Sequence, residues 1–260
     1  IPFDQIEVRH GDTDEVARGN GTGGSRSLQI GGSAVLQASE LLVEQAKDIA
    51  ASLLEADRED IVLDMVGGTF SVAGTPAISR SWGEVAEAAI AEQSIPFLAE
   101  ADFQPEGSAF PFGVHLSVVE IDRDTGQVVP LRHVTCDDCG TIVNPLLVDG
   151  QVHGGVASGM AQALMEEFVY DEDGNPKTAT FLDYGIVSAA ELPSFERLPQ
   201  ETPSPLNPLG AKGIGESGTI GATPALQNAV VDALAHLGVR HVDIPTTPER
   251  VWSTIRSAAD

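Results

Sequence analysis

The chain has 260 residues and carries 39 acidic against 14 basic side chains, a formal net charge of −25. Without a basic surface it does not suit a nucleic-acid backbone or an anionic membrane surface, and its 42% of hydrophobic residues excludes a disordered chain. The few lysines (Lys47, Lys177 and Lys212) favour a salt-rich cytoplasm, where ions screen the repulsion between carboxylates, over the alternative of an ordinary acidic protein.

The first hundred residues predict a strand, a long helix, a hairpin and a short helix. Apolar side chains between Ala34 and Leu53 recur at helical spacing, so one face of that helix should be buried. Gly67 and Gly68 separate two apolar runs, which is typical of a hairpin. The predicted bounds are a strand over 1–10, a turn over 11–14, a glycine-rich loop over 19–27, a helix over 33–55, hairpin strands over 61–66 and 69–72, and a helix over 82–91.

The middle of the chain predicts two strands and a second long helix. Val114, Leu116 and Val118 alternate with polar residues, as they do in a half-buried strand. The segment 171–176 has the Asp-x-Asp spacing of a calcium loop but lacks the later ligands and the closing glutamate, so a hairpin turn is favoured. The other predicted bounds are a turn over 122–126, a strand over 128–134 and a helix over about 146–168.

The last seventy residues predict an irregular crossing followed by two helices. Five prolines between 191 and 208 are typical of an ordered crossing loop rather than a domain linker. Thr223 and Pro224 are typical of a helix N-cap and first turn, and Gly238 of the helix end. A strand over 239–244 and a terminal helix from Thr247–Pro248, with Val251, Trp252 and Ile255 facing inward, complete an α+β pattern without internal repeats.

The two cysteines, Cys136 and Cys139, form a single CxxC that cannot staple a chain of this length. No second CxxC and no histidine pair with zinc-ligand spacing accompanies it, so a structural zinc site is not expected. No run approaches 18 apolar residues, and the first residues lack the features of a signal peptide. We therefore expect a cytoplasmic protein without a membrane span, whose sequence begins in the middle of a fold.

The segment 208–221 carries the strongest chemical signal, because its many glycines surround Lys212 and Glu216. Glycines let a backbone approach a bulky ligand closely, and a carboxylate held in a tight loop suits a general base. The alternative is a glycine-rich turn before a helix, with Glu216 exposed. The spacing does not match a phosphate-binding P-loop.

Five motifs resemble, in order, those of the molybdenum hydroxylases, the xanthine dehydrogenase and aldehyde oxidase family. The resemblance extends over nearly the whole chain, and within the family it is strongest to the large subunits of aerobic carbon monoxide dehydrogenases. The motifs are Gly11-Asp12-Thr13-Asp14, Gly21-Thr22-Gly23-Gly24-Ser25-Arg26-Ser27, the segment from Asp137 to Pro145, Gly150-Gln151-Val152-His153-Gly154-Gly155, and Lys212-Gly213-Ile214-Gly215-Glu216.

This resemblance implies a second molybdopterin-binding domain, extending over residues 1–260, that binds molybdenum through the cofactor, in its cytosine dinucleotide form, and uses no protein side chain as a metal ligand. Glu216 would be the base that deprotonates a metal-bound hydroxyl for attack on an electron-poor carbon, and electrons would leave through iron–sulfur clusters to FAD on other subunits. Gln151 would bind the molybdenum or pterin ligands. A loop of Gly24, Ser25, Arg26 and Ser27 would wrap the dinucleotide, and Lys212, Gly213, Ile214 and Gly215 would back the metal site.

The chain also departs from the family, whose large subunits are roughly three times longer. Their upstream part holds the substrate-selecting residues and the copper-binding cysteine loop of true carbon monoxide dehydrogenases, a context that neither Cys136 nor Cys139 has. We therefore expect a fragment or split subunit, inactive alone, that works with the rest of the large subunit, an iron–sulfur small subunit and an FAD medium subunit on a small-molecule substrate. The alternatives are an aldehyde, purine or N-heterocycle hydroxylase and a non-catalytic pterin-nucleotide-binding or assembly module.

The remaining candidates in this part of the sequence are assigned to packing. Cys139 is expected to be a buried small residue near the cofactor rather than a metal ligand, and Cys136 to pack. His153 is expected to be a histidine at the start of a helix. The other histidines, His10, His115, His133, His236 and His241, show no ligand spacing and are expected to be structural.

Overall fold

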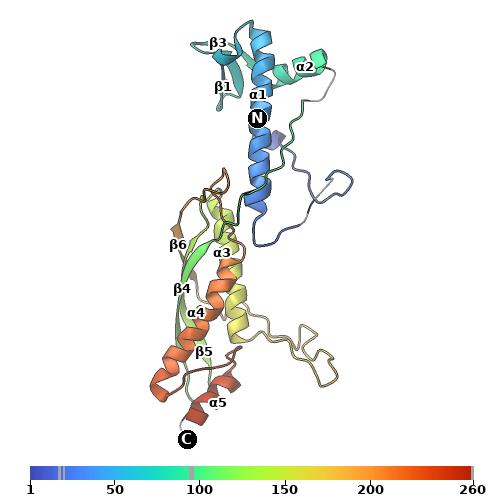
Figure 1. Ribbon diagram of the computed structural model, residues 1–260. Coiled ribbons are helices and arrows are strands. Elements are labelled where there is room, and N and C mark those ends of the chain that lie inside the picture. The colour runs from blue at the N-terminus through green and yellow to red at the C-terminus, as the bar shows by residue number, and fades with distance from the viewer. Residues whose placement is uncertain (17–18, 20, 94–96, 259–260) are drawn as a thin grey trace. The chain divides into compact units, whose positions relative to one another are not determined.

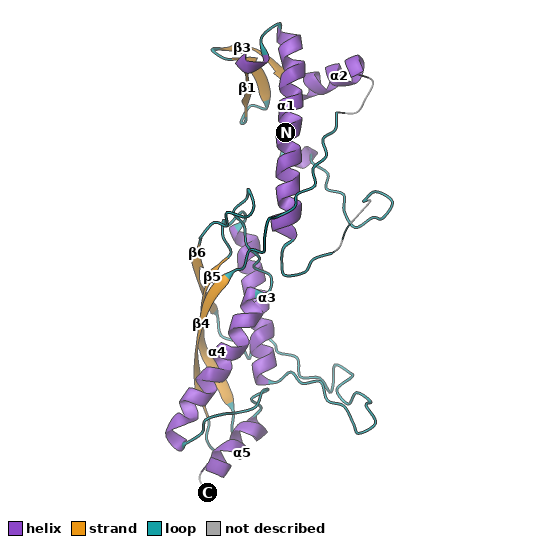
Figure 2. Cartoon of the chain, viewed as in Figure 1, coloured by secondary structure: helices purple, strands orange, loops and turns teal. Residues whose placement is uncertain are grey.

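A computed structural model describes residues 1–16, 19, 21–93 and 97–258 of the chain; residue 20 of the predicted glycine-rich loop lies outside them. The chain forms two compact units, an N-terminal unit of residues 1–21 and 30–104 and a C-terminal unit of residues 22–29 and 105–260. Helices and strands are mixed in both (Figures 1 and 2), as the α+β pattern predicts. The short segment 22–29 thus belongs with a part of the chain that begins only at residue 105.

The N-terminal unit packs two helices against a small antiparallel sheet. Helix α1 (Ser33–Leu54) confirms the predicted long helix, and α2 (Trp82–Gln93) the short one. Strands β1 (Ile61–Asp64) and β2 (Thr69–Val72) form the predicted hairpin, and β3 (Thr75–Ser81) pairs with β2 at the sheet edge. The core of this unit consists of small and apolar side chains from α1, α2 and the sheet, among them Ala46, Ala50, Ile61, Phe70 and Val85.

Two expectations for this unit were wrong. Residues 1–10 do not form a strand: only a short 3₁₀ turn, Phe3–Gln5, is present, and the apolar side chains of Phe3 and Val8 are exposed, so no packed face holds the segment extended. Strand β3 was not predicted. Its first four residues are exposed and include Pro76, which lacks an N–H group, so its sequence gives no alternating apolar signal.

The C-terminal unit is a three-stranded sheet with two long helices on one face (Figure 1). Strand β4 (Phe112–Ile121) pairs antiparallel with β5 (Val128–Asp138), and β6 (Phe195–Gln200) adds to β5 in parallel. Helix α3 (Pro145–Leu164) packs beside α4 (Ser217–Leu234), which is followed by a 3₁₀ turn that ends at Gly238. Helix α5 (Pro248–Ala258) closes the core with Val251 and Ile255, while Trp252, expected inside, remains 41% exposed.

Helices α3 and α4 run parallel and meet through glycines. A Cβ atom at Gly159 would lie 2.9 Å from both the Cβ atom of Ala222 and the carbonyl oxygen of Thr219, and one at Gly218 only 2.7 Å from the carbonyl oxygen of Val152. The Thr219 and Thr223 hydroxyls donate to the carbonyl oxygens of Gly155 and Gly159, at 2.9 and 3.0 Å. The two helix backbones therefore approach as closely as hydrogen-bonded contact allows, and the N-termini of both helices lie at the same end of the unit.

Three local predictions in this unit were wrong for identifiable reasons. Strand β6 lies inside the predicted crossing loop; its proline, Pro199, is tolerated because β6 is an edge strand. Residues 239–244 form no strand, because the Val242 carbonyl accepts a hydrogen bond from the Gln227 side chain instead of a neighbouring strand. Helix α4 begins at Ser217, six residues before the predicted cap Thr223, because its first turns are held by contact with α3.

The two faces of β4 are reversed relative to the sequence expectation. Val114, Leu116 and Val118 are exposed, whereas His115 and Ser117 point to the side covered by α4. A Cβ atom at Gly221 of α4 would lie 2.5 Å from the His115 ring, which shows how closely the helix covers this polar face. Alternation alone gives the period of a strand but not which face is buried.

The contact between α3 and α4 can be tested with two glycines of α3. We expect Gly159→Ala to destabilise the protein by about 1–3 kcal/mol, because the new methyl group would overlap α4. The matched variant Gly154→Ala, whose Cβ meets nothing within 4 Å, should be neutral or stabilise by up to about 1 kcal/mol through helix propensity. Urea unfolding of both variants measures the difference. Equal effects of the two substitutions would contradict the close helix contact.

Candidate functional site

The structure brings several of the predicted site residues together at the N-terminal end of α4. The Ser25 hydroxyl donates a hydrogen bond to Oε2 of Glu216 at 2.9 Å, although the two residues are 191 positions apart. A Cβ atom at Gly215 would lie 3.0 Å from Ser25 Oγ and 3.2 Å from Gln151 Oε1, so both side chains flank this glycine. The loop at 22–29, helix α3 and the turn before α4 thus contribute to one cluster, which we call the Glu216 cluster.

Glycine is required where the loop and the turn touch. A Cβ atom at Gly213 would lie 2.9 Å from Ser25 Cβ and 3.0 Å from the carbonyl oxygen of Gly24. Any larger residue would push the loop away and separate Ser25 from Glu216. Ser25 itself has a φ of 54°, a left-handed conformation that costs a non-glycine residue roughly 1 kcal/mol. Such a conformation is maintained only where the surrounding structure enforces it.

The cluster is suited to negatively charged or polar ligand groups. Helices α3 and α4 present their N-termini at the same end, where the helix dipoles favour anionic groups. Two buried polar atoms near this end, Ser217 Oγ and Gln29 Nε2, have no hydrogen-bond partner among the described residues. Both atoms are enclosed by the protein itself, so they reflect local packing rather than positions that a ligand can reach. Glu216 and Gln151 are exposed, so the cluster is open to solvent in this chain.

Lys212 lies against Asp138 rather than against Glu216. Its Nζ atom is 3.2 Å from Asp138 Oδ2, and the two side chains are only 14% and 6% exposed. Burial raises the pKa of Asp138, but hydrogen bonds from Thr202, Gly140 and Lys212 outweigh it and lower the pKa to about 2. The backbone of Lys212 also donates to the Cys139 carbonyl at 2.7 Å. Lys212 therefore anchors the glycine-rich turn to the end of β5 and has no recorded contact with the Glu216 side chain.

The remaining predicted residues surround the cluster without direct contact to Glu216 in the described structure. Gly24 packs against Gly213, Ile214 is half-buried against the core, and Arg26 is exposed. Ser27 shares a hydrogen bond with Thr22 inside the loop. Cys139 is buried, as predicted, whereas Cys136 is only half-buried. The predicted turn 171–176 is held by hydrogen bonds from Asn175 to the Asp171 carboxylate.

A buried polar network lies between the sheet and α4, and sequence reasoning missed it. Ser117 Oγ is 2.7 Å from His133 Nδ1, His133 Nε2 is 3.3 Å from His115 Nδ1, and His115 Nε2 is 3.2 Å from Asp137 Oδ1. The hydrogen bonds are satisfied if each hydroxyl or ring N–H group donates toward the Asp137 carboxylate, with both rings neutral. The two histidines are 18 positions apart, and only the pairing of β4 with β5 makes them neighbours.

The network holds His133 in its neutral form. Burial and, to a smaller extent, the neighbouring His115 together lower the pKa of His133 from 6.5 to about 4, against the opposing effect of Asp137. Phe195 of β6 packs edge-on against the same ring, at 6.2 Å between ring centroids. Every ring nitrogen of His115 and His133 has a partner within hydrogen-bond distance, which explains how polar residues can occupy the covered face of β4.

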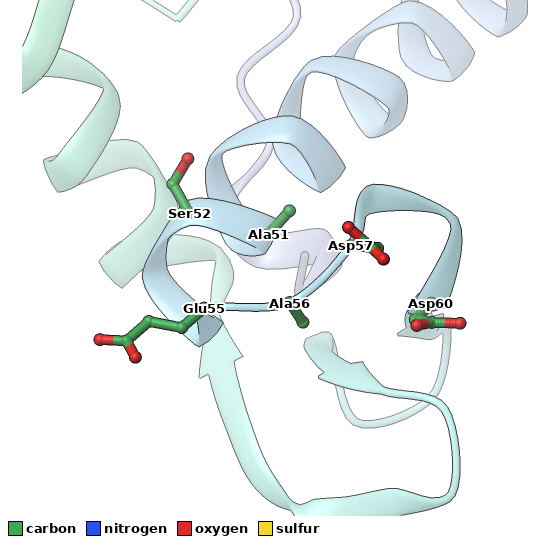
Figure 3. A pocket seen from close by; sticks show the side chains of 6 residues that line it. All are labelled: Ala51, Ser52, Glu55, Ala56, Asp57 and Asp60. Carbon is green, nitrogen blue, oxygen red and sulfur yellow. The ribbon is translucent and has the colours of Figure 1, made fainter.

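Two hollows of the N-terminal unit are separate from the Glu216 cluster. The first, of about 650 Å³, follows the end of α1 and is lined by Ala51, Ser52, Glu55, Ala56, Asp57 and Asp60. Its carboxylates point in different directions (Figure 3) and so form no common binding centre. The second, of about 600 Å³, lies beside Trp82 and Phe97. The described residues contain no group of three or more histidine, cysteine or acidic side chains placed to hold a metal ion.

Comparison with known proteins places these observations in a family context. The family model for the molybdopterin cofactor-binding domain matches residues 1–193, which include Ser25 and Gln151 but not Glu216. In the part of the chain that the structure describes, no helix has both the length and the apolar character needed to cross a bilayer.

The similarity to individual proteins extends over nearly the whole chain. The carbon monoxide dehydrogenase large chain of Hydrogenophaga pseudoflava is 38% identical over 98% of this chain and 32% of its own length. The nicotine 6-hydroxylase large subunit of Paenarthrobacter nicotinovorans is 37% identical over 100% of this chain and 32% of its own. The reconstituted CO dehydrogenase structure from Oligotropha carboxidovorans superposes with a TM-score of 0.89 at 37% identity, covering 98% of this chain and 32% of that one. The chain therefore spans about a third of the length of these relatives.

The ion pair between Lys212 and Asp138 gives a first test of the site. We expect Lys212→Met to destabilise the protein by about 3 kcal/mol, because it leaves the buried Asp138 carboxylate without its cation. Lys177→Met, at an exposed lysine of the 171–176 hairpin region, should stay within about 0.5 kcal/mol of the parent. The free energy of unfolding in urea at pH 7 measures both. A neutral Lys212→Met would show that the pair does not anchor the turn.

The buried histidine network gives a second test, through pH. Because the pKa of His133 is about 4 when folded and near 6.5 when unfolded, the unfolded chain binds more protons between these values. His133 should therefore lower the stability by up to about 3 kcal/mol as the pH falls from about 6.5 through 4, whereas Asp138 acts only below about pH 4.

The contribution of His133 can be isolated by two variants. His133→Gln should remove most of this pH dependence, while His241→Gln, whose side chain is 71% exposed, should retain it. The measurement is the free energy of unfolding at pH 7.0, 5.5 and 4.5. The same pH dependence in His133→Gln as in the parent would contradict the assignment to this network.

Proposed function

The chain belongs to the family of molybdopterin cofactor-binding domains, and on that premise we propose that it forms one wall of a molybdenum hydroxylase site and supplies its catalytic base, Glu216. The observation that carries the proposal is the convergence of Ser25, Gln151 and Glu216 around Gly213 and Gly215. These residues come from three separate segments, and their positions depend on glycines that leave no space for a side chain. A plain glycine-rich turn would not require this contact.

The residues at the cluster fit a pterin nucleotide in two respects. The exposed residues of the loop 21–24 and the N-terminus of α4 suit phosphate and pterin oxygens. Arg26, exposed in the same loop, can reach a phosphate group outside the cluster. When bound, molybdopterin supplies the molybdenum centre that takes up the electrons of the hydroxylation. We include in the proposal that the cofactor is the cytosine dinucleotide form of molybdopterin.

In this proposal Glu216 accepts a proton at its carboxylate during the reaction. Ser25 donates to one carboxylate oxygen, Oε2, and so leaves the other oxygen available to a reacting group. The hydrogen bond also fixes the carboxylate's direction, which matters because proton transfer requires contact at about 3 Å. Gln151 stands on the other side of Gly215 and can orient a polar group of the cofactor or substrate. Because Glu216 is exposed here, water must be excluded by another part of the assembly.

The substrate class is carbon monoxide or an electron-poor carbon of an aldehyde, purine or N-heterocycle. The relatives named above act on carbon monoxide and on nicotine at almost the same identity to this chain, 38% and 37%. Identity therefore does not choose between a carbon monoxide dehydrogenase and a heterocycle hydroxylase, and the latter is the second candidate. Electrons would pass to iron–sulfur and FAD subunits, in a salt-rich cytoplasm that the −25 charge favours.

Replacement of Glu216 tests the proposed role. In the enzyme purified with its partner subunits, Glu216→Gln should retain molybdenum content within about twofold and lose turnover by roughly 10²–10⁴-fold, the range for removal of a general base. Glu249→Gln, at an exposed position on α5, should retain both. Metal analysis and single-turnover reduction of the enzyme measure the two properties.

The outcomes separate the hypotheses. Retained turnover in Glu216→Gln would contradict the proposal that Glu216 is the catalytic base. A parent chain that never copurifies with molybdenum or a molybdenum-containing partner would instead favour a non-catalytic binding or assembly module.

A further inference from the structure

The uncovered face of the β4–β6 sheet is apolar across all three strands. We call it the outer sheet face, the side opposite α3 and α4. Side chains exposed by 41–67% lie on it, and at the centre of the sheet they are accompanied by the half-buried Val134 and Cys136. The exposed members are Phe112, Val114, Leu116 and Val118 of β4, Leu131 of β5 and Leu198 of β6.

The strand register makes this a continuous surface rather than scattered side chains. Val114 of β4 lies opposite Cys136 of β5, which in turn lies opposite Leu198 of β6. One step along, Leu116 lies opposite Val134. Neighbouring side chains on a sheet face are about 5 Å apart, so these rows are in mutual contact. An apolar area of this extent on a soluble domain indicates an interaction surface.

The charge distribution sets the outer sheet face apart from the rest of the chain. Arg132 and Glu196, which flank Val134, form a bidentate pair across β5 and β6, with Nε–Oε1 and Nη2–Oε2 distances of 2.5 and 2.7 Å, so their charges neutralise each other. Within a chain that carries 39 acidic residues, an apolar surface with a neutralised ion pair is the part least adapted to contact with water and salt. Carboxylate-rich surfaces would repel one another, whereas the part of this face from Phe112 to Val118 can be buried without an unpaired charge, with Glu120 at its far end.

The contacts on the inner face of the same sheet exclude a rotated β4 whose apolar side chains would face α4. His115 and Ser117 are committed to the buried network under α4, so rotating the strand would expose that network and place Leu116 under Gly221. Both faces of the sheet are therefore built to be covered, one by the helices of this chain and the other by something outside it.

We propose that the outer sheet face is covered by the part of the large-subunit polypeptide that lies outside these 260 residues. The length of the relatives supports this occupant, because about two thirds of each lies beyond the segment that matches this chain. One end of the face adjoins the candidate site, since Phe112 lies opposite Asp138, the partner of Lys212. A polypeptide seated on the face would thus extend toward the open side of the Glu216 cluster. The inference rests on the proposed function for the identity of the occupant.

Cysteine labelling tests the proposal directly. In a Cys136→Ser background, Leu116→Cys places a reporter on the outer sheet face, and Val66→Cys places the control in the β1–β2 turn of the other unit, where Val66 is 99% exposed. Cys139 is buried and serves as an internal unreactive thiol. The rate of alkylation by iodoacetamide is compared between the 260-residue chain alone and the complete large subunit, whether that is one longer polypeptide or this chain copurified with its complement.

The expected result is that the Leu116→Cys reporter reacts at least tenfold more slowly, relative to Val66→Cys, in the complete large subunit than in the chain alone. Equal relative rates would overturn the proposal. So would a chain that dimerises by light scattering and protects Leu116→Cys by itself, because a second copy would then be the occupant. Protection does not depend on molybdenum or turnover, so a protected face with an inactive, metal-free protein would contradict the proposed function while supporting this inference.

Discussion

The close contact between α3 and α4 is the constraint on which the site depends. Because Gly155, Gly159 and Gly218 allow the two backbones to touch, the helices stay parallel and in a fixed register. That register places Gln151, in the second turn of α3, beside the turn that precedes α4. Glu216 then lies at the N-cap of α4, where Ser25 of the distant loop can reach it. A single bulkier residue in this contact would move Glu216 without touching it.

The second group of interactions fixes the turn that carries Glu216 at its other end. Lys212 is held by the buried carboxylate of Asp138, and the backbone of the turn pairs with the residues that follow β5. The carboxylate has four donors in or near the same loop, which compensates its burial and leaves it charged over the physiological range. The turn that carries Glu216 is thus held by a close helix pair on one side and by a satisfied ion pair on the other.

The C-terminal unit is built in a way that makes sense as part of a larger subunit. Its covered sheet face holds a network of serine, histidine and aspartate, while its uncovered face is apolar, the reverse of an isolated domain. The ring nitrogens and the Ser117 hydroxyl of the polar network have partners under α4, whereas Oδ2 of Asp137 is buried without one among the described residues. The Glu216 cluster is likewise uncovered in this chain, since Glu216 and Gln151 are exposed.

The sequence alone determined the long helices, the β1–β2 hairpin and the β4–β5 pair, because apolar periodicity and turn residues act locally. It also identified Ser25, Gln151 and Glu216, through motifs whose resemblance to a family could be read in order along the chain. Strand β6, the early start of α4 and the orientation of β4 were decided only by tertiary structure. In each case a contact between distant segments outweighed the local preference. Strand β5 paired with the proline-containing edge strand β6, and α3 held the first turns of α4. The histidine network required the polar face of β4 to turn inward.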